Sequence, residues 1–247
     1  MSEQLSAKMK NDGKDSNSLI IPNLISACKD SLKTVEKLVA DMRESTSSRV
    51  VKNGKIDASI LESEQYTVHG LAWFATYATS IREMLNWAER LISVNQFGET
   101  EKLVLQSAFG EYLSQIFGGI PMSQGEIIRL KDLNFSNSEI QALLDENILT
   151  LITNGNTADV RMKIAKLVAD GNFGNYGLDD ETLVMIQDQF RKFVQDQIIP
   201  HAQEWHNKDE LIPDAIIKQM SELGVFGLTI PEAVSYTHLT LPTNREV

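Results

Sequence analysis

The sequence predicts an all-α fold, in which a helical bundle is followed by a second, shorter set of helices. Three observations support this class: apolar residues recur every three or four positions over long stretches, glycine and proline stand where helices would end, and strand-like alternation is almost absent. The one short piece that looks extended is Leu228–Ile230. With 42% hydrophobic and 23% charged residues, the chain has the composition of an ordinary globular protein that can bury a core.

The chain begins with a polar segment, residues 1–18, which has no apolar periodicity and is predicted to be a disordered arm. The first helix is expected to start near Pro22, which suits a first helical turn, and to end at Ser45–Ser48. Its apolar stripe consists of Leu24, Cys28, Leu32, Val35, Val39 and Met42.

Two more helices follow with clear stripes. The first is predicted to close near Gly98, and its stripe consists of Leu71, Phe74, Ala78, Ile81, Leu85, Ala88 and Ile92. The second is predicted to end at Gly118-Gly119, with Pro121 just beyond, as a left-handed helix cap requires. Its stripe consists of Leu105, Ala108, Tyr112 and Ile116.

Two capping-box patterns come next, Ser123–Glu126 and Ser136–Glu139, and each predicts the start of a helix. The second helix is expected to run to Asn154-Gly155. A further amphipathic helix carries Val160, Ile164, Leu167 and Val168.

A Gly/Asn-rich stretch, residues 171–178, is predicted to be a linker, so residues 19–170 form a helical extension domain. These glycines do not indicate a phosphate-binding loop, because no strand precedes them and their spacing is not that of a nucleotide fingerprint.

The last native segment, residues 179–233, is predicted to contain two helices. Asp179 or Asp180 can cap the first helix, and Pro200 is expected to end or kink it. The second starts near Pro213 and has Gly224 just after its last turn. Their apolar positions are Leu183, Ile186, Phe190, Phe193 and Ile198 in the first helix and Ile216, Ile217, Met220 and Leu223 in the second.

The net charge of −11 disfavours binding to nucleic acid or to an anionic membrane surface. No apolar run is long enough to span a bilayer, and the polar start lacks the hydrophobic region of a signal peptide, so a cytoplasmic protein is expected. Cys28 is the only cysteine, which excludes internal disulfides, and its place on an apolar stripe favours a buried small hydrophobe over a reactive thiol.

The residues themselves present no catalytic constellation, so none is nominated as catalytic, as cofactor-binding or as a metal ligand. His201, Glu204 and His206 cluster near Trp205, but a zinc site needs three or four convergent ligands, and a partly exposed helix end is the favoured interpretation. His69, which is expected on the approach to the helix that contains Leu71, is interpreted as a structural histidine rather than a functional one. The aromatic residues Trp73, Phe74, Tyr77 and Trp87 lie on a helix where packing explains them without a ligand.

The final segment, Val234–Val247, resembles a translated sequencing adapter rather than part of the protein. The native reading frame is then expected to be interrupted just after Glu232, with Ala233 as a hybrid codon. Without Arg245 and Glu246 the net charge is still −11, so the acidity belongs to the native part.

The segment from Gln189 to Glu232 resembles the opening of an acyl-CoA dehydrogenase. The resemblance rests on the ordered run Gln189–His206, then Leu211–Pro213, and then Glu222–Glu232. At this point the family sequence continues Pro-Glu-Glu-Tyr-Gly-Gly, so a second Glu is expected at position 233. A Glu codon begins with G, and this G followed by the first adapter bases, CT, encodes the Ala that is found there. Residues 179–233 would therefore be the start of the family's N-terminal helical domain.

This resemblance implies a flavoprotein that oxidises the α,β carbons of an acyl thioester. In that family a glutamate base removes the α-proton, the β-hydride passes to FAD, and an electron-transferring flavoprotein reoxidises the flavin. The expected partners are thus an acyl-CoA substrate and electron-transferring flavoprotein, and the enzyme is expected to be a homo-oligomer. The catalytic glutamate and the flavin contacts are expected outside this chain, so the fragment itself is expected to be inactive.

A long helical extension precedes this segment, whereas most acyl-CoA dehydrogenases begin almost directly with the segment itself. The extension therefore narrows the choice of subfamily. The blocks His69–Tyr77, Asn86–Arg90, Phe109–Tyr112 and Gly118–Gln124 resemble the extension of bacterial (2S)-methylsuccinyl-CoA dehydrogenases, which implies oxidation of (2S)-methylsuccinyl-CoA to mesaconyl-CoA. Two alternatives stay open: another short branched or dicarboxylic acyl-CoA, or a non-catalytic helical interaction or oligomerisation module.

Overall fold

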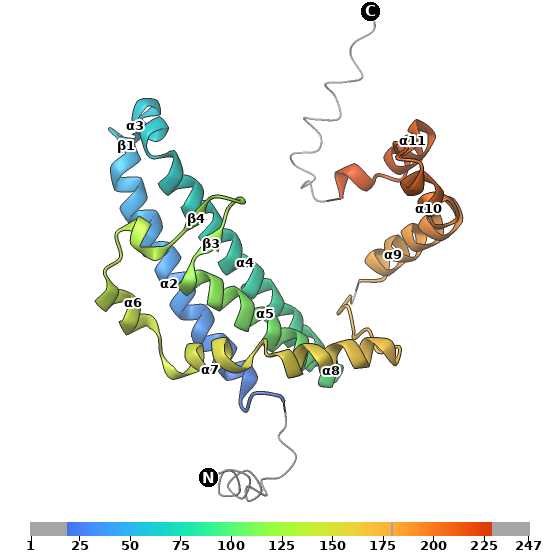
Figure 1. Cartoon of the computed structure of the whole chain (residues 1–247), viewed down its shortest axis with the longest axis horizontal. Coiled ribbons are helices and arrows are strands. Elements are labelled where there is room, and N and C mark those ends of the chain that lie inside the picture. The colour runs from blue at the N-terminus through green and yellow to red at the C-terminus, as the bar shows by residue number, and fades with distance from the viewer. Residues whose placement is uncertain (1–18, 179, 229–247) are drawn as a thin grey trace, which may run out of the picture. The chain divides into compact units, whose positions relative to one another are not determined.

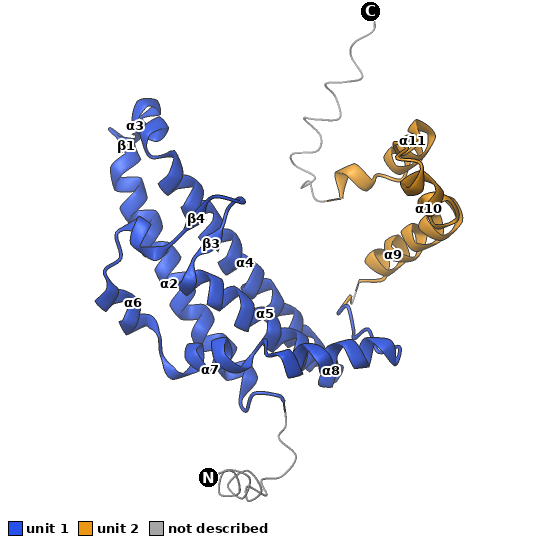
Figure 2. Cartoon of the chain, viewed as in Figure 1, with its two compact units in different colours: residues 1–177 blue, residues 178–247 orange. Residues whose placement is uncertain are grey.

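The computed structural model describes residues 19–178 and 180–228 and divides the chain into two compact units, residues 1–177 and residues 178–247 (Figure 2). Helices dominate both units, and the described strands form only two short antiparallel hairpins. The predicted all-α class is confirmed.

Three long helices build unit 1: α2 (Leu24–Val50), α4 (Gln65–Ser93) and α5 (Glu99–Gly118), which lie side by side in Figure 1. Most residues of the three predicted stripes lie in the core, where Phe74 and Phe109 are the largest fully buried side chains. Ile92 corrects the prediction, because it is 42% exposed and its neighbour Leu91 is buried instead. Burying aromatic and aliphatic side chains in this way supplies most of the favourable free energy of folding.

The predicted end of the first helix at Ser45–Ser48 is wrong, because α2 continues to Val50. Thr46 and Val50 stay buried on the core face, and Arg49 pairs with Glu64 at 3.2 Å. These tertiary contacts outweigh the weak helix propensity of the serines. The hairpin β1 (Val51–Lys52) and β2 (Lys55–Ile56) then leads to the short helix α3 (Ala58–Ser63), which Asp57 caps by accepting hydrogen bonds from Ser59 N and Ile60 N.

Helix α4 differs from the prediction at both ends. It begins at Gln65, so His69 lies inside the helix and not on the approach to it, and it ends at Ser93, before Gly98. Asn95 in the left-handed region (φ 57°) turns the chain after the last helical turn. Gly98 instead caps the start of α5, where its backbone N donates to Glu101 Oε2 at 2.9 Å.

Helix α5 ends at Gly118, as predicted, but the expected left-handed cap is wrong, because Gly119 has φ 127° and ψ 131° and so lies outside the left-handed helical region. The predicted helix start at Ser123–Glu126 is wrong: these residues form the turn of a hairpin between β3 (Ile120–Pro121) and β4 (Ile127–Ile128). Ser123 N donates to Glu126 O at 3.3 Å, and the Ser123 hydroxyl donates to Glu126 Oε2 at 3.2 Å. The two side chains of the capping-box pattern thus close a turn here.

The capping box at Ser136–Glu139 is confirmed, since Ser136 N donates to Glu139 Oε2 and Glu139 N donates to the Ser136 hydroxyl. The helix it opens does not reach Asn154, which corrects the prediction. After the 3-10 turn η1 (Leu130–Leu133), the chain forms α6 (Asn137–Leu143) and then α7 (Glu146–Asn154). Asp145 separates them because its side chain accepts from Ile148 N and starts a new helix.

Helix α7 packs against α5 through two glycines. A Cβ atom on Gly110 would lie 2.7 Å from Leu151 O, and one on Gly155 would meet the backbone of α5 and α7 even more closely. Only glycine permits this approach. Helix α8 (Ala158–Ala169), with Thr157 as its N-cap, completes the helices of unit 1 and confirms the predicted helix over this region.

Unit 2 begins with α9 (Glu181–Phe193), which Asp180 caps through Thr182 N. A π-helical turn, Val194–Ile198, joins it to α10 (Ile199–Asn207), where Pro200 occupies the first turn. Pro200 therefore changes the helical register instead of ending the helix, because its missing N–H cannot join the regular ladder. Helix α11 (Asp214–Glu222) follows, and Gly224 at φ 74° stands just after it, as predicted, before the turn η3 (Val225–Gly227).

Several predictions lie outside the described residues: the disordered arm 1–18, the cap Asp179, the extended pair Thr229-Ile230 and the tail Val234–Val247. Leu228 itself has a right-handed helical conformation (φ −60°, ψ −28°). Within 19–178 and 180–228, no helix is long and apolar enough to cross a bilayer.

Candidate functional site

The histidine cluster of unit 2 lies on one short helix, α10. The rings of His201 and Trp205 stack with centroids 5.6 Å apart, and Glu204 pairs with Lys208 at 2.5 Å on an exposed surface. His206 is in the last turn. Across the described ranges, no three His, Cys, Asp or Glu side chains come together as a metal ion would require.

His69 lies on the exposed side of α4, where its Nε2 accepts a hydrogen bond from Trp73 Nε1 at 3.0 Å. This bond assigns the ring proton to Nδ1 in the neutral form. A shallow hollow of about 530 Å³ beside it is lined mostly by apolar side chains, together with Tyr66 and Glu126. The hydrogen bond from Trp73 gives His69 a structural contact within α4, in line with its interpretation as a structural histidine.

The aromatic residues of α4 form an edge-to-face series with α5. The rings of Trp73 and Tyr77 lie 6.2 Å apart, and those of Tyr77 and Tyr112 lie 4.7 Å apart. The Tyr77 hydroxyl donates to Gln115 Oε1 at 2.6 Å, and burial, together with Tyr112 and Glu111, raises the pKa of Tyr77. These contacts pack two helices together, in agreement with the interpretation of the aromatic residues as packing groups.

Cys28 is completely buried on α2 and has no disulfide partner. Burial raises the pKa of its thiol far above the ordinary range, because the thiolate would have to lose its hydration. The group therefore stays a neutral thiol and packs as a small hydrophobe, as its place on the apolar stripe predicts.

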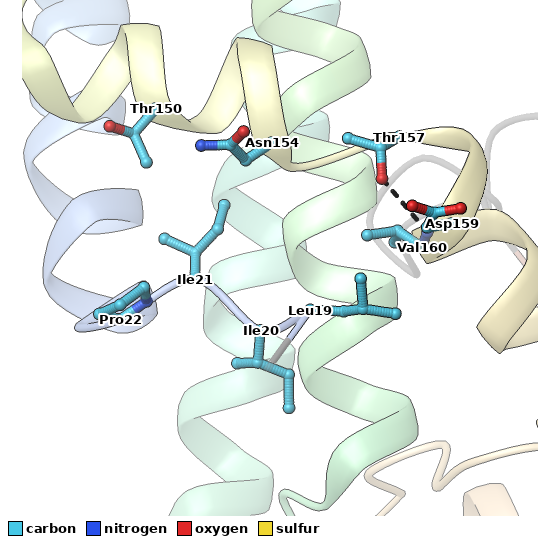
Figure 3. A pocket seen from close by; sticks show the side chains of 9 residues that line it. All are labelled: Leu19, Ile20, Ile21, Pro22, Thr150, Asn154, Thr157, Asp159 and Val160. Carbon is cyan, nitrogen blue, oxygen red and sulfur yellow. Dashed lines mark hydrogen bonds between the residues drawn. The ribbon is translucent and has the colours of Figure 1, made fainter. Parts of the chain in front are cut away.

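A second hollow, of about 360 Å³, lies where the described chain begins (Figure 3). The buried side chain of Gln106 holds this end in place: its Oε1 accepts from Ile21 N at 3.0 Å, and its Nε2 donates to Leu19 O at 2.9 Å. The polar groups facing the hollow include Thr150, Asn154 and Asp159. They offer no paired acid and base, and the Thr157 hydroxyl is already used to cap α8.

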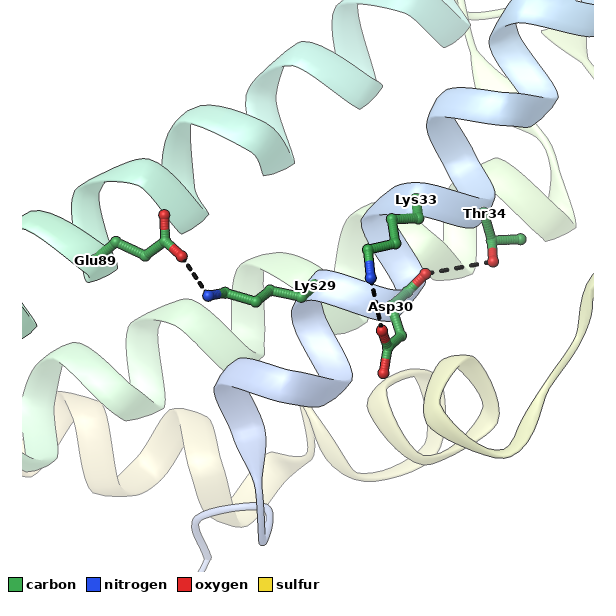
Figure 4. A network of polar contacts seen from close by, with 5 residues as sticks. All are labelled: Lys29, Asp30, Lys33, Thr34 and Glu89. Atoms are coloured by element: carbon green, nitrogen blue, oxygen red, sulfur yellow. Dashed lines mark hydrogen bonds and ion pairs between the residues drawn. The ribbon is translucent and has the colours of Figure 1, made fainter.

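Charged side chains connect the helices of unit 1 at the surface. Lys29 of α2 pairs with Glu89 of α4 at 2.6 Å, beside the pair Lys33 and Asp30 (Figure 4). The side chains of the first pair are about half exposed and Lys33 of the second is 77% exposed, so each pair contributes at most about 1 kcal/mol to stability. They support the bundle and form no site for chemistry.

The polar cluster that sequence reasoning missed is centred on Glu101, which is only 3% exposed. Its carboxylate accepts from Gly98 N, Asn175 N and Asn175 Nδ2 at 2.8–2.9 Å. The spacing of Gly98 and Glu101 matches a capping box and could have indicated the first contact, but nothing in the sequence links Glu101 to Asn175. This cluster attaches part of the predicted linker, residues 171–178, to unit 1.

Unit 2 has a different surface, because its helices carry large exposed apolar side chains. Leu211 is 91% exposed and Met185 is 71% exposed, whereas Ile216 is the one buried hydrophobic residue among the described part of this unit. Amphipathic helices with such faces are components of a larger core. Other exposed members are Leu183, Val184, Val194, Ile199, Ile212, Ile217, Phe226 and Leu228.

Comparison with known proteins identifies this second segment. The family described as "Acyl-CoA dehydrogenase, N-terminal domain" matches residues 180–241. The matched range runs past Glu232 into the adapter-like tail, so the adapter interpretation stays a prediction.

Two relatives match the chain over different ranges. A (2S)-methylsuccinyl-CoA dehydrogenase of Cereibacter sphaeroides is 45% identical over 217 residues, which is 86% of this chain and 39% of the relative. A glutaryl-CoA dehydrogenase of Desulfococcus multivorans is 40% identical over 50 residues, which is 20% of this chain and 13% of that protein. The chain thus spans about two fifths of the length of the first relative, and their shared region includes the helical extension. By these likenesses the chain belongs to the acyl-CoA dehydrogenases, a family of oxidoreductases, and its residues 180–241 match the N-terminal domain of that family.

Proposed function

We propose that this chain is the N-terminal part of an FAD-dependent acyl-CoA dehydrogenase that oxidises (2S)-methylsuccinyl-CoA to mesaconyl-CoA. The supporting observation is the 45% identity to a relative of that name over 86% of the chain. A likeness over 217 residues cannot come from the N-terminal domain alone, which starts only at residue 180. It includes the helical extension, which distinguishes this relative from the general family pattern.

The proposed chemistry is that of the family. A glutamate base takes the α-proton of the thioester, and bound FAD supplies the acceptor for the β-hydride. No described side chain is assigned to the flavin or to the base, because the polar groups of unit 2 form no buried, convergent set. Its exposed apolar helix faces suit a wall of a substrate cavity that the rest of such an enzyme would complete. The chain alone is proposed to be inactive.

The remaining parts of the proposal concern partners and location. An enzyme of this class would pass its electrons to electron-transferring flavoprotein, and we propose a homo-oligomer located in the cytoplasm. The net charge of −11 gives no support for a nucleic-acid partner or an anionic membrane surface.

The first test is to resequence the source DNA across the codon for Glu232 by a method without transposase adapters. Continuation into the family sequence, with a later glutamate base, would support the proposal. A genuine Val-Ser-Tyr-Thr-His tail followed by a stop would refute it. The extended protein should then show the visible absorbance of flavin and its highest kcat/KM with (2S)-methylsuccinyl-CoA.

A second candidate within the family changes only the acyl group. The likeness to a glutaryl-CoA dehydrogenase over 50 residues favours a dicarboxylic or short branched acyl-CoA as the alternative. The same assay distinguishes the two, because the preferred thioester is the one with the highest kcat/KM in a panel of such substrates.

A third candidate is of another class, a helical interaction or oligomerisation module formed by the extension. Its support is that unit 1 has a hydrophobic core of its own, made entirely of residues between Ile21 and Leu151. Separate expression tests this: a cooperative melt and a defined oligomer would favour an autonomous module, and a molten helical state would exclude it.

A further inference from the structure

The segment that leaves unit 1, residues 172–177, is held by three kinds of backbone and side-chain contact centred on Asn175. Its backbone N and its Nδ2 both donate to Glu101 Oε1 at 2.8 Å, and Nδ2 also lies 3.2 Å from Gln96 O. Its carbonyl oxygen accepts from Trp87 Nε1 at 3.0 Å. Side chains of α4 and α5 therefore fix Asn175 together.

The Glu101 carboxylate, which accepts hydrogen bonds from Asn175, would be destabilised by the loss of this partner. Glu101 is 3% exposed, and no ion pair involving it is found within residues 19–178 and 180–228. A buried carboxylate is costly unless it is hydrogen-bonded. One oxygen is satisfied by Gly98 N at the start of α5, and the other depends on Asn175.

The glycines of this segment let the backbone turn and approach the side chains of Glu101 and Trp87 closely. Gly174 and Gly177 have positive φ angles of 74° and 68°. A Cβ on Gly174 would lie 3.3 Å from Glu101 Oε1, and one on Gly177 would lie 3.1 Å from Trp87 Cδ1. Larger residues would be strained in φ and crowded against the two side chains that hold Asn175.

We infer that residues 172–177 form a clamp on Glu101 and Trp87 that fixes the point at which the chain leaves unit 1. Only Leu178 and Asp179 then separate the clamp from Asp180, the N-cap of α9. With the clamp open, the free connection would extend from Asn172 to Asp179. At roughly 3.3–3.6 Å per extended residue, its reach would increase from about 7 Å to about 28 Å.

The clamp is a positioning device whose effect does not depend on the proposed enzymatic function. A shorter connection confines two linked units to a smaller volume and raises their effective concentration toward each other. Asn175 is the positioning residue, because it supplies the donors that Glu101 needs and the acceptor for Trp87.

The test compares limited chymotrypsin cleavage of the full chain with that of its Asn175→Asp variant. The aromatic side chains of Phe173 and Tyr176 are 72% and 64% exposed, so chymotrypsin can recognise them, but it can cut only when the clamped backbone opens. The variant places a second carboxylate against Glu101. We expect cleavage after these two residues to become at least about tenfold faster, as for loss of part-buried hydrogen bonds to a charged group.

Asn207→Asp is the matched control, because it adds the same charge on exposed α10 and keeps an oxygen that can accept from Gln203. Its cleavage rate after Phe173 and Tyr176 should equal that of the unmodified chain. Equal rates for the unmodified chain and Asn175→Asp would overturn the inference. Asn175→Ala provides a milder variant if Asn175→Asp fails to fold: it keeps the backbone donor, so an intermediate rate is expected, and an unchanged rate would count against the clamp.

An NMR measurement on the unmodified chain provides a second readout. The indole N–H of Trp87 should exchange slowly with solvent, since it donates to Asn175 O, and should exchange faster in both Asn175 variants. An unprotected Trp87 indole in the unmodified chain would also overturn the inference.

Discussion

Single residues decide how closely the helices of unit 1 approach each other, and Gly110 is the clearest case. It lies on α5 where the backbone of α7 passes, so that a Cβ would meet Leu151 O at 2.7 Å and Asn156 N at 3.0 Å. Backbone atoms cannot give way as the end of a flexible side chain can. We expect Gly110→Ala to lower the free energy of unfolding of unit 1 by about 1–3 kcal/mol, measured by urea denaturation.

Gly118→Ala is the control for this prediction. Gly118 ends the same helix, and nothing lies within 4 Å of a Cβ added there. Alanine should leave the stability unchanged or raise it by up to about 1 kcal/mol, because of its higher helix propensity. If both variants showed the same change, close approach to α7 would not be the reason for Gly110.

At the same scale, the Glu111 carboxylate predicts a pH dependence. Hydrogen bonds from Gln115 Nε2 (2.7 Å) and Asn156 Nδ2 (2.9 Å) lower the pKa of Glu111 below its ordinary value. A lowered folded-state pKa means that the stabilisation is present above the unfolded-state pKa and is lost as the pH falls through the folded-state value. Because the side chain is mostly exposed, the effect is small.

Glu111→Gln should therefore lower the Tm near neutral pH, and the difference from the unmodified chain should shrink as the pH falls below about 4. Thermal melts at several pH values measure this difference. Glu62→Gln, which removes an exposed carboxylate without a hydrogen bond in the structure, controls for the loss of one negative charge. A Tm difference that stays constant with pH would refute the assignment to the Glu111 carboxylate.

At the scale of helices, the three long helices of unit 1 were predictable from sequence, whereas the short helix α3, the break between α6 and α7 and several helix ends were not. The stripes of α2, α4 and α5 identify long helices because apolar periodicity records which face is buried. The serines at 45–48 looked like an end, yet burial of Thr46 and Val50 carries α2 through them. Ser123–Glu126 has the same pattern as Ser136–Glu139, but the flanking strands turn it into a hairpin.

For the candidate functional residues, too, local sequence patterns predict some roles but not contacts between distant parts of the chain. The burial of Cys28 followed from its place on an apolar stripe, and the packing role of Tyr77 followed from its place on an apolar helix. The contact between Glu101 and Asn175 joins residues 74 positions apart, and local sequence carries no signal for such a pair. The glycines of residues 171–177 indicated a linker by composition, whereas in the structure Gly174 and Gly177 have positive φ angles and lie close to Glu101 and Trp87.

The π-helical turn before Pro200 leads to a prediction about an element. Proline has no N–H to donate, and its ring crowds the preceding turn, so the ladder widens over Val194–Ile198. We expect Pro200→Ala to convert this stretch to regular α-helix, because alanine restores the missing backbone donor and removes the ring. Backbone carbon chemical shifts of residues 194–199 measure the change. A π-helical turn that persists in the variant would show that side-chain packing causes it.

At the scale of the whole molecule, the two units differ in how much core they contain. Unit 1 buries a continuous cluster from Ile21 to Leu151, supplied by three long helices and the segments packed on them. Unit 2 buries Ile216 and leaves Leu211, Met185 and Ile199 at least 61% exposed. Folding must offset the conformational entropy of every ordered residue, and burial of apolar area is the main favourable contribution.

Separate expression of the two units should therefore give opposite results. We expect residues 19–177 to melt in one cooperative transition, and residues 178–247 to lack one and to bind a hydrophobic dye, because their apolar helix faces have too few partners. Circular dichroism melts and dye fluorescence measure both properties. The full 247-residue chain should bind dye and tend to aggregate through the same faces. A sharp melt without dye binding for residues 178–247 would mean that this segment has a sufficient core of its own and would remove the physical reason to expect further chain to cover it.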